Sequence, residues 1–213
     1  MAGELNVFGT FQAGPWKNNT ELQKAVDKRE WSPATAELKM AASSGKGAVE
    51  GAVNCFNLLC AIIRNKPDRV NIFSHANEFY LYFSGTVVPG NVNWDTRRPE
   101  NWLDVDYLDN LEKNGVGFKD GRTKNATFEQ FRKALPAHST ICLYACHAAL
   151  GGELCKGIAK YFRANVKAFS DEVRYYPTIP QKGPISLKYA IGNNEQVSNF
   201  HELDRYFSAP ITP

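Results

Sequence analysis

The sequence of 213 residues lacks a hydrophobic run long enough to cross a membrane. No stretch reaches about 18 uncharged apolar residues, the length that a transmembrane helix needs. The segment Met1–Leu5 also lacks the basic and then apolar layout of a signal peptide. We therefore expect no membrane partner. We expect a cytoplasmic protein, or one exported by a route that uses no signal peptide.

Neither basic nor acidic residues are in large excess over the other. There are 25 Lys and Arg residues and 22 Asp and Glu residues, which gives a net charge of +3. The basic residues are scattered along the chain, whereas nucleic acids bind clustered positive charge. We therefore expect no nucleic-acid partner. The sequence leaves the oligomeric state open.

Cysteine is scarce, with five residues, an odd number. The apolar sequence around Cys55, Cys60 and Cys142 predicts buried free thiols in a reducing compartment. Cys142 and Cys146 lie about 13 Å apart if the chain between them is a strand, at a rise of about 3.3 Å per residue. A zinc ion binds sulfur at about 2.3 Å, so one ion cannot bridge them. We therefore expect no metal site.

The order of apolar segments predicts an α/β protein of one domain, residues 1–213, with a core over about 46–192. Strand patterns cover residues 5–11, 70–75, 79–88, 140–146, 166–170 and 185–191. Helical patterns cover residues 21–28, 46–65, 102–113, 127–135, 153–163 and 197–207. This alternation predicts a mostly parallel sheet with helices on both faces, a three-layer αβα sandwich. Residues 12–45 are expected to be peripheral, and 193–213 to form a C-terminal helix and tail.

Two of the predicted strands end at a reactive side chain. The apolar run Val70–Phe73 leads to His75, and the run Thr140–Ala145 leads to Cys146. Ligands of parallel sheets bind at the carboxyl ends of the strands, so we expect the imidazole and the thiol to meet there. A lone cysteine at a strand end is usually an ordinary core residue. Two reactive residues at matched strand ends favour a nucleophile and its base.

Each residue of this pair has a predicted role. Cys146 would be the nucleophile, and His75 would be general base toward the thiol and then general acid toward the leaving amine. A helix predicted to begin shortly after Cys146 would favour its thiolate form. The backbone N–H groups of Cys146 and Ala76 would stabilise the oxyanion. His147 is expected to point to the opposite face of the strand, as adjacent strand residues do, unless the turn has already begun at this residue.

These segments resemble the caspase-like cysteine peptidases, a class that includes the caspases, legumain, gingipain, clostripain and the self-processing domains of large bacterial toxins. The resemblance covers about residues 68–176 and rests on the blocks Asn71–His75, Ile141–Cys146 and Val166–Ser170. The family pattern has one hydrophobic block that ends in His-Gly, where this chain has Ala76, and another that ends in Ala-Cys. It implies a caspase-like fold and a thiol protease with a Cys–His dyad, self-processing as in some relatives, with no metal or organic cofactor.

Substrate specificity is predicted to be set where the strand over 166–170 ends. Ser170, Asp171 and Glu172 lie there. An acidic pocket would favour Arg or Lys before the scissile bond through charge-assisted hydrogen bonds. The alternative is an acidic loop that faces solvent.

Two other functions fit the same residues. A non-catalytic relative could use the crevice to bind a protein or peptide, and Ala76 favours this reading because alanine tolerates fewer conformations than glycine. A bacterial effector could use the same Cys–His pair for another acyl-transfer chemistry, such as deamidation. The substrate, the mode of activation and the role of residues 12–45 stay open.

Overall fold

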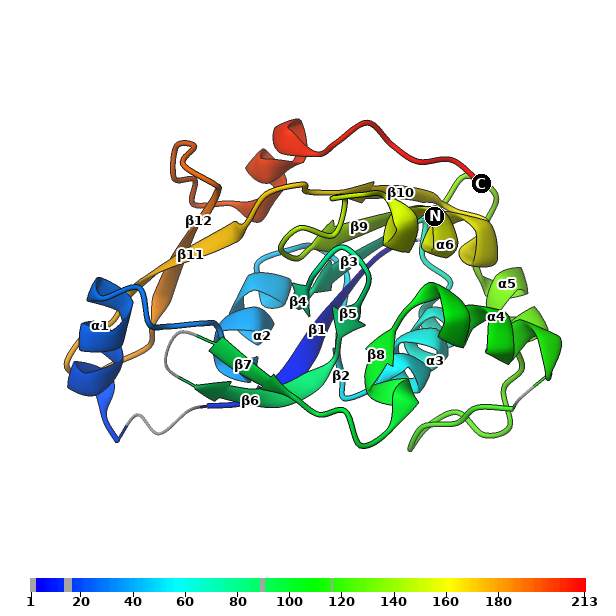
Figure 1. Cartoon of the computed structure of the whole chain (residues 1–213), viewed down its shortest axis with the longest axis horizontal. Helices are drawn as coiled ribbons and strands as arrows, with labels where there is room; N and C mark the ends of the chain where they lie inside the picture. Colours follow the sequence, from blue (N-terminus) through cyan, green and yellow to red (C-terminus); the bar gives the residue numbers. More distant parts are fainter. Residues whose placement is uncertain (1–2, 14–16, 89–90, 116) are drawn as a thin grey trace.

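The computed structural model describes residues 3–13, 17–88, 91–115 and 117–213. Its central sheet has the strand order β10-β9-β3-β1-β6-β7, and β2 is also paired with β1 (Figure 1). The parallel strands are β1 (Glu4–Gln12), β2 (Ala48–Ala52), β3 (Arg69–Phe73), β6 (Ser84–Val88), β9 (Thr140–Tyr144) and β10 (Asn165–Ala168). The edge strand β7 (Asn91–Trp94) pairs antiparallel with β6. The predicted α/β class with a mostly parallel sheet is confirmed.

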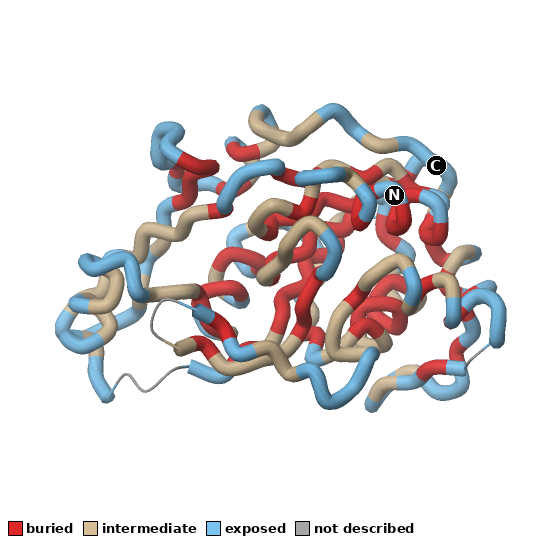
Figure 2. The backbone as a smooth tube through the Cα atoms, in the orientation of Figure 1, coloured by how far each residue is buried: buried red, intermediate tan, exposed pale blue. Residues whose placement is uncertain are grey.

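Successive residues of the strands fill two apolar clusters, as alternation across a pleated sheet requires. Val7 and Ile72 belong to one cluster, and the neighbouring Phe8 and Phe73 belong to the other. The first cluster contains side chains of α3 (Cys55–Asn65), α4 (Val105–Lys113), α5 (Phe128–Ala134) and α6 (Glu153–Phe162). The second contains side chains of α2 (Thr35–Ser43) and the 3-10 helix η2 (Phe200–Tyr206). In Figure 2 the segments coloured as buried include the central strands, which lie between these two sets of helices.

The remaining elements surround the carboxyl ends of the parallel strands. A small antiparallel sheet contains β4 (His75–Ala76), β5 (Leu81–Tyr82) and β8 (Trp102–Leu103), and a separate hairpin contains β11 (Val173–Thr178) and β12 (Ser186–Ile191). Helix α1 (Asn19–Asp27), at the far end of Figure 1 from α6, has no buried residue, and the short 3-10 helix η1 spans Pro99–Asn101. None of the described helices is long and apolar enough to cross a membrane.

The single helix predicted over residues 46–65 is wrong, because this stretch is strand β2 followed by helix α3. Two members of the apolar stripe that predicted the helix, Val49 and Val53, are exposed. The helix begins at Cys55, where the side chain of the N-cap residue Asn54 accepts the N–H of Asn57.

Other differences lie in segments where the sequence pattern is weak. Helix α2 and strands β7 and β11 form where no element was predicted. The helix expected over 197–207 is the 3-10 helix η2. The strand expected to reach Cys146 ends at Tyr144, so the cysteine lies in the turn that follows β9.

Gly47 makes the turn that leads into β2. Its φ is +90°, and an added Cβ would lie 1.9 Å from the carbonyl oxygen of Glu4. We expect Gly47→Ala to lower the free energy of unfolding by about 3 kcal/mol, through a strained backbone and a clash with β1. Urea unfolding measures this change. The control is Gly121→Ala, where an added Cβ meets no described atom within 4 Å. Similar losses in both variants would contradict the explanation.

Candidate active site

His75 and Cys146 leave the sheet at the same edge. Strands β3 and β9 are parallel neighbours, with Phe73 opposite Tyr144. His75 is the second residue after Phe73, and Cys146 is the second residue after Tyr144. Both side chains line one cleft of about 430 Å³. The structure therefore brings the predicted pair together in a single concave site.

Two segments far apart in the sequence form the walls of this cleft. One wall is α1 with the chain that follows it, which contributes Val26, Arg29, Trp31 and Pro33. We call residues 28–34 of this chain the strap. The other wall is the beginning of β11 with Glu172 before it. The peripheral segment, whose role the sequence left open, thus covers the candidate site.

The strap fixes the state of the His75 ring. Nε2 lies 2.8 Å from the carbonyl oxygen of Pro33. A carbonyl only accepts hydrogen bonds, so Nε2 carries the hydrogen and Nδ1 keeps the free lone pair. Burial lowers the pKa of His75 to about 4. At neutral pH the ring is therefore uncharged, with Nδ1 able to accept a proton.

Aromatic side chains pack around the same ring. Phe11 meets it edge-on with ring centroids 4.7 Å apart, and Trp94 lies at 5.9 Å. These residues come from β1 and β7, so two strands of the central sheet and the strap together orient one imidazole. This packing, with the Pro33 hydrogen bond, supplies the orientation that a catalytic base requires.

Cys146 differs from the other cysteines of the chain. It is half-buried, whereas the other four are buried. Its Sγ lies 3.7 Å from the carbonyl oxygen of Val173. Burial raises the pKa of Cys146 to about 11, and the negative charge of Glu172 acts in the same direction. The expected thiolate is therefore wrong for the resting protein. Helix α6 begins only at Glu153, and a helix dipole acts mainly within its first turn.

His147 makes the sharp turn that follows the cysteine. Its φ is +54°, a left-handed value that is uncommon outside glycine. Its N–H donates to the carbonyl of Asp171 at 3.1 Å, its Nδ1 lies 3.3 Å from the carbonyl oxygen of Ser170, and its own carbonyl accepts the N–H of Leu150 at 2.9 Å. The turn has already begun at His147, which is the alternative that the sequence left open to a place on the opposite face of the strand. Its ring lines the cleft but is held against Ser170.

Ala76 occupies the second predicted oxyanion position. In the β4–β5 hairpin it lies opposite Leu81, and Asn77 donates its N–H to Tyr80 at 3.0 Å. Asn77 and Tyr80 therefore form a hydrogen-bonded pair next to the Ala76–Leu81 pair. Because hydrogen-bonded and non-hydrogen-bonded pairs alternate along an antiparallel ladder, the Ala76–Leu81 pair exchanges no backbone hydrogen bonds. The Ala76 N–H is thus available to a ligand. Ala76 does not have a positive φ, so alanine fits this position without strain.

The residues predicted to set specificity separate into two groups. Glu172 lines the cleft, where its carboxylate pairs with Arg174 at 3.2 Å. Ser170 and Asp171 are not among the lining residues, and their backbone carbonyls hold His147. With Arg29 also in the lining, two cationic side chains accompany one carboxylate. This balance of charge gives no preference for a basic substrate side chain.

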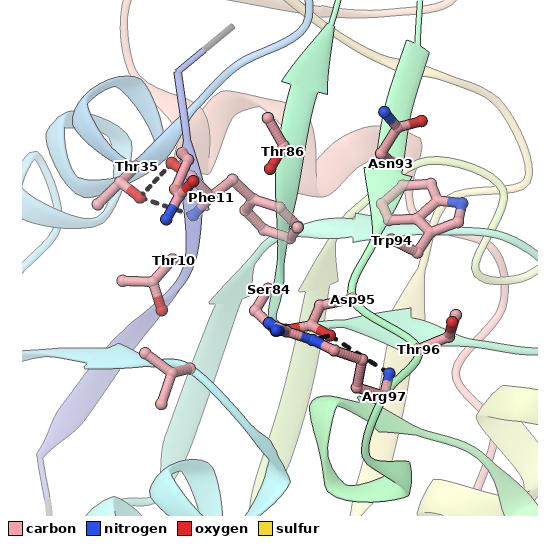
Figure 3. Close-up of a pocket in the computed structure, with 13 residues that line it drawn as sticks. Thr10, Phe11, Thr35, Ser84, Thr86, Asn93, Trp94, Asp95, Thr96 and Arg97 are labelled. Atoms are coloured by element: carbon pink, nitrogen blue, oxygen red, sulfur yellow. Dashed lines mark hydrogen bonds and ion pairs between the residues drawn. The ribbon is translucent and has the colours of Figure 1, made fainter.

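A larger hollow of about 680 Å³ lies at the carboxyl end of β1, beside β6 and β7. Figure 3 shows Thr10, Ser84 and Thr86 around it, with Asp95 paired to Arg97 at 2.7 Å. The hydrogen bond from Arg97 lowers the pKa of Asp95 to about 2, so this carboxylate is a weak base. The described lining holds no cysteine or histidine. This hollow contains neither member of the predicted pair, and no sequence motif indicated it.

No protein-family model matches the chain, and no curated protein or solved structure matches it either. The interpretation of the site therefore rests on its geometry and chemistry.

Proposed function

We propose that this chain is a cysteine endopeptidase with a caspase-like arrangement, in which Cys146 is the nucleophile and His75 the general acid and base. The observation that supports this most strongly is the placement of the two side chains. They leave adjacent parallel strands at one edge and line one cleft. The Pro33 carbonyl also holds the imidazole in the tautomer that accepts a proton at Nδ1.

The first step starts from a neutral thiol and a neutral imidazole. His75 Nδ1 takes the thiol proton while Sγ of Cys146 attacks the carbonyl carbon of the scissile bond. Sγ of Cys146 lies 3.7 Å from the carbonyl oxygen of Val173. Catalytic hydrogen bonds commonly tighten when substrate binds, so the proposal includes a rotation of the thiol toward His75.

The second step breaks the peptide bond. The N–H groups of Cys146 and Ala76 donate to the negatively charged oxygen of the tetrahedral intermediate. Imidazolium His75 returns its proton to the leaving amine as the C–N bond breaks, which leaves a thioester on Cys146. Water then attacks the thioester with His75 as base, and the carboxylic acid and the thiol are released.

The cleft also offers a place for the substrate backbone. Strand β11 pairs with β12 along one edge, and its residues Arg174–Tyr176 line the cleft. An extended peptide can add to the other edge of such a strand through main-chain hydrogen bonds. The hydroxyl of Tyr175 is buried and has no hydrogen-bond partner among the described residues.

Alkylation with iodoacetamide tests the nucleophile without a known substrate. We expect Cys146 to react at least about tenfold faster than the other cysteines, because those four are buried. The rate should rise about tenfold per pH unit between pH 6 and 9, since the thiolate is the reactive form and the pKa is about 11. Peptide mapping by mass spectrometry measures each site. Equal, slow labelling of all five cysteines would rule out the proposed enzyme.

A further inference from the structure

Exposed apolar side chains gather in the two loops that follow the dyad. Among the described residues, large hydrophobic side chains are exposed at Val49, Val53, Phe79, Tyr80 and Leu150. Phe79 and Tyr80 form the tip of the hairpin that begins at His75, and Leu150 lies in the loop between Cys146 and α6. Phe79 is 46% and Leu150 47% exposed. We call Phe79, Tyr80 and Leu150 the apolar platform.

The two loops that carry the platform touch each other. A Cβ added to Gly151 would lie 3.4 Å from the carboxylate of Glu78. The turn after β9 and the β4–β5 hairpin therefore lie side by side, as Figure 1 also shows. The platform residues therefore lie on two adjacent loops, one of which follows His75 and the other Cys146.

A row of aromatic rings joins the platform to the imidazole. The ring centroids of Tyr80 and Tyr82 are 5.9 Å apart, and Tyr82 stacks on Trp94 at 3.9 Å. Trp94 in turn lies 5.9 Å from His75. Because these rings are in contact from one end to the other, Tyr80 has a fixed position relative to the imidazole.

The hairpin tip is also held by its own polar contacts. Oδ1 of Asn77 accepts the N–H of Phe79 at 2.9 Å and the N–H of Tyr80 at 2.8 Å. Its Nδ2 donates to the hydroxyl of Tyr82 at 3.3 Å. A rigid exposed apolar surface loses little conformational entropy when a ligand covers it, which favours binding.

We propose that the apolar platform binds an apolar side chain of the substrate on the carboxyl side of the scissile bond, an inference that rests on the proposed peptidase function. His75 gives its proton to the leaving amine, so the segment after the scissile bond departs on the side of His75. The platform hairpin begins there. The cleft is lined by β11, α1 and the strap, and its lining contains none of the platform residues. In Figure 1 both β11 and α1 lie to the left of the β4–β5 hairpin.

The test uses two sets of peptides with the same randomised amino-terminal half. In the first set the carboxyl-terminal half contains phenylalanine and glycine, and in the second set it contains serine and glycine. We expect kcat/KM to be about tenfold higher for the phenylalanine set, the size of effect of one apolar contact. The Phe79→Ser/Leu150→Ser double variant should lose this preference. Val49→Ser, which removes an exposed apolar side chain elsewhere, should keep it.

Equal rates for the two sets with the unmodified protein, or a preference that survives the double substitution, would overturn the inference. If no peptide is cleaved at all, the proposed peptidase function fails separately. In that case, fluorescence anisotropy measures how tightly the same two peptide sets bind to the Cys146→Ala protein, and this comparison tests the platform. About tenfold tighter binding of the phenylalanine set, lost in the double variant, supports the platform; equal binding or none overturns it.

Discussion

Replacing Cys146 with alanine is expected to lower kcat/KM for peptide cleavage by about 10⁴-fold or more. The substitution removes the atom that forms the thioester, and loss of a covalent nucleophile leaves only the residual effects of binding and oxyanion stabilisation. The side chain is half-buried in a turn, so the fold should tolerate alanine there. Initial rates on the best-cleaved peptide give the value.

Cys142→Ala is the matched control, because Cys142 lies in the strand that leads to Cys146 but is fully buried. Well below its melting temperature this variant should keep most of its activity. If the two alanine variants lost activity equally, the effect would come from the fold, and the assigned role of Cys146 would be wrong.

Replacing His75 with glutamine is expected to lower kcat/KM by about 10³-fold, because the thiol has a pKa of about 11 and needs a base at neutral pH. The unmodified protein should lose kcat/KM on acidification only near pH 4, where the ring takes up a proton. The residual activity of the variant should instead increase with pH across the neutral range, as the thiolate fraction increases. Rates measured between pH 4 and 9 distinguish the two profiles.

The lowered pKa of His75 also predicts that stability changes with pH, which can be measured without a substrate. Its folded pKa of about 4 is below the ordinary value of 6.5, so the unfolded chain binds more protons between these pH values. Stability is therefore complete above pH 6.5 and falls as the pH is lowered toward 4, by roughly 3 kcal/mol at most. Urea unfolding of the unmodified protein should show this loss, and His75→Gln should reduce it.

His147→Gln serves as the control for both readouts, since His147 lines the same cleft but its ring faces the carbonyl of Ser170. Its activity should change by less than tenfold. A larger loss in this variant than in His75→Gln would reverse the assignment of the base.

Much of the sheet could be predicted because its strands are short apolar runs with clear ends. The runs that lead to His75 and Cys146 are β3 and β9, and they are neighbours in the sheet. Hydrophobic periodicity failed at Val49 and Val53, which fit a helical stripe but are exposed in and just after β2. Periodicity shows how apolar residues are spaced along the sequence, but it does not show which of these residues become buried in the fold.

The surroundings of the dyad could not be predicted, since they depend on contacts between distant segments. Pro33 reaches His75 across 42 positions of sequence. The carbonyl of Val173 faces Cys146 from a strand that has no clear pattern. The Pro33 contact sets the tautomer of the ring. Partial burial between such distant segments raises the pKa of the Cys146 thiol, so the sequence suggested a thiolate where the structure favours a thiol.

The most direct test of the central proposal is a search for new peptide termini. A complex peptide mixture is incubated with the unmodified protein or with Cys146→Ala, and the products are identified by mass spectrometry. We expect new amino termini that arise only with the unmodified protein and disappear when His75 is replaced. The absence of new termini, their presence with Cys146→Ala, or a gain of about 1 Da at Asn or Gln without cleavage would contradict a cysteine endopeptidase, and the last result would identify a deamidase.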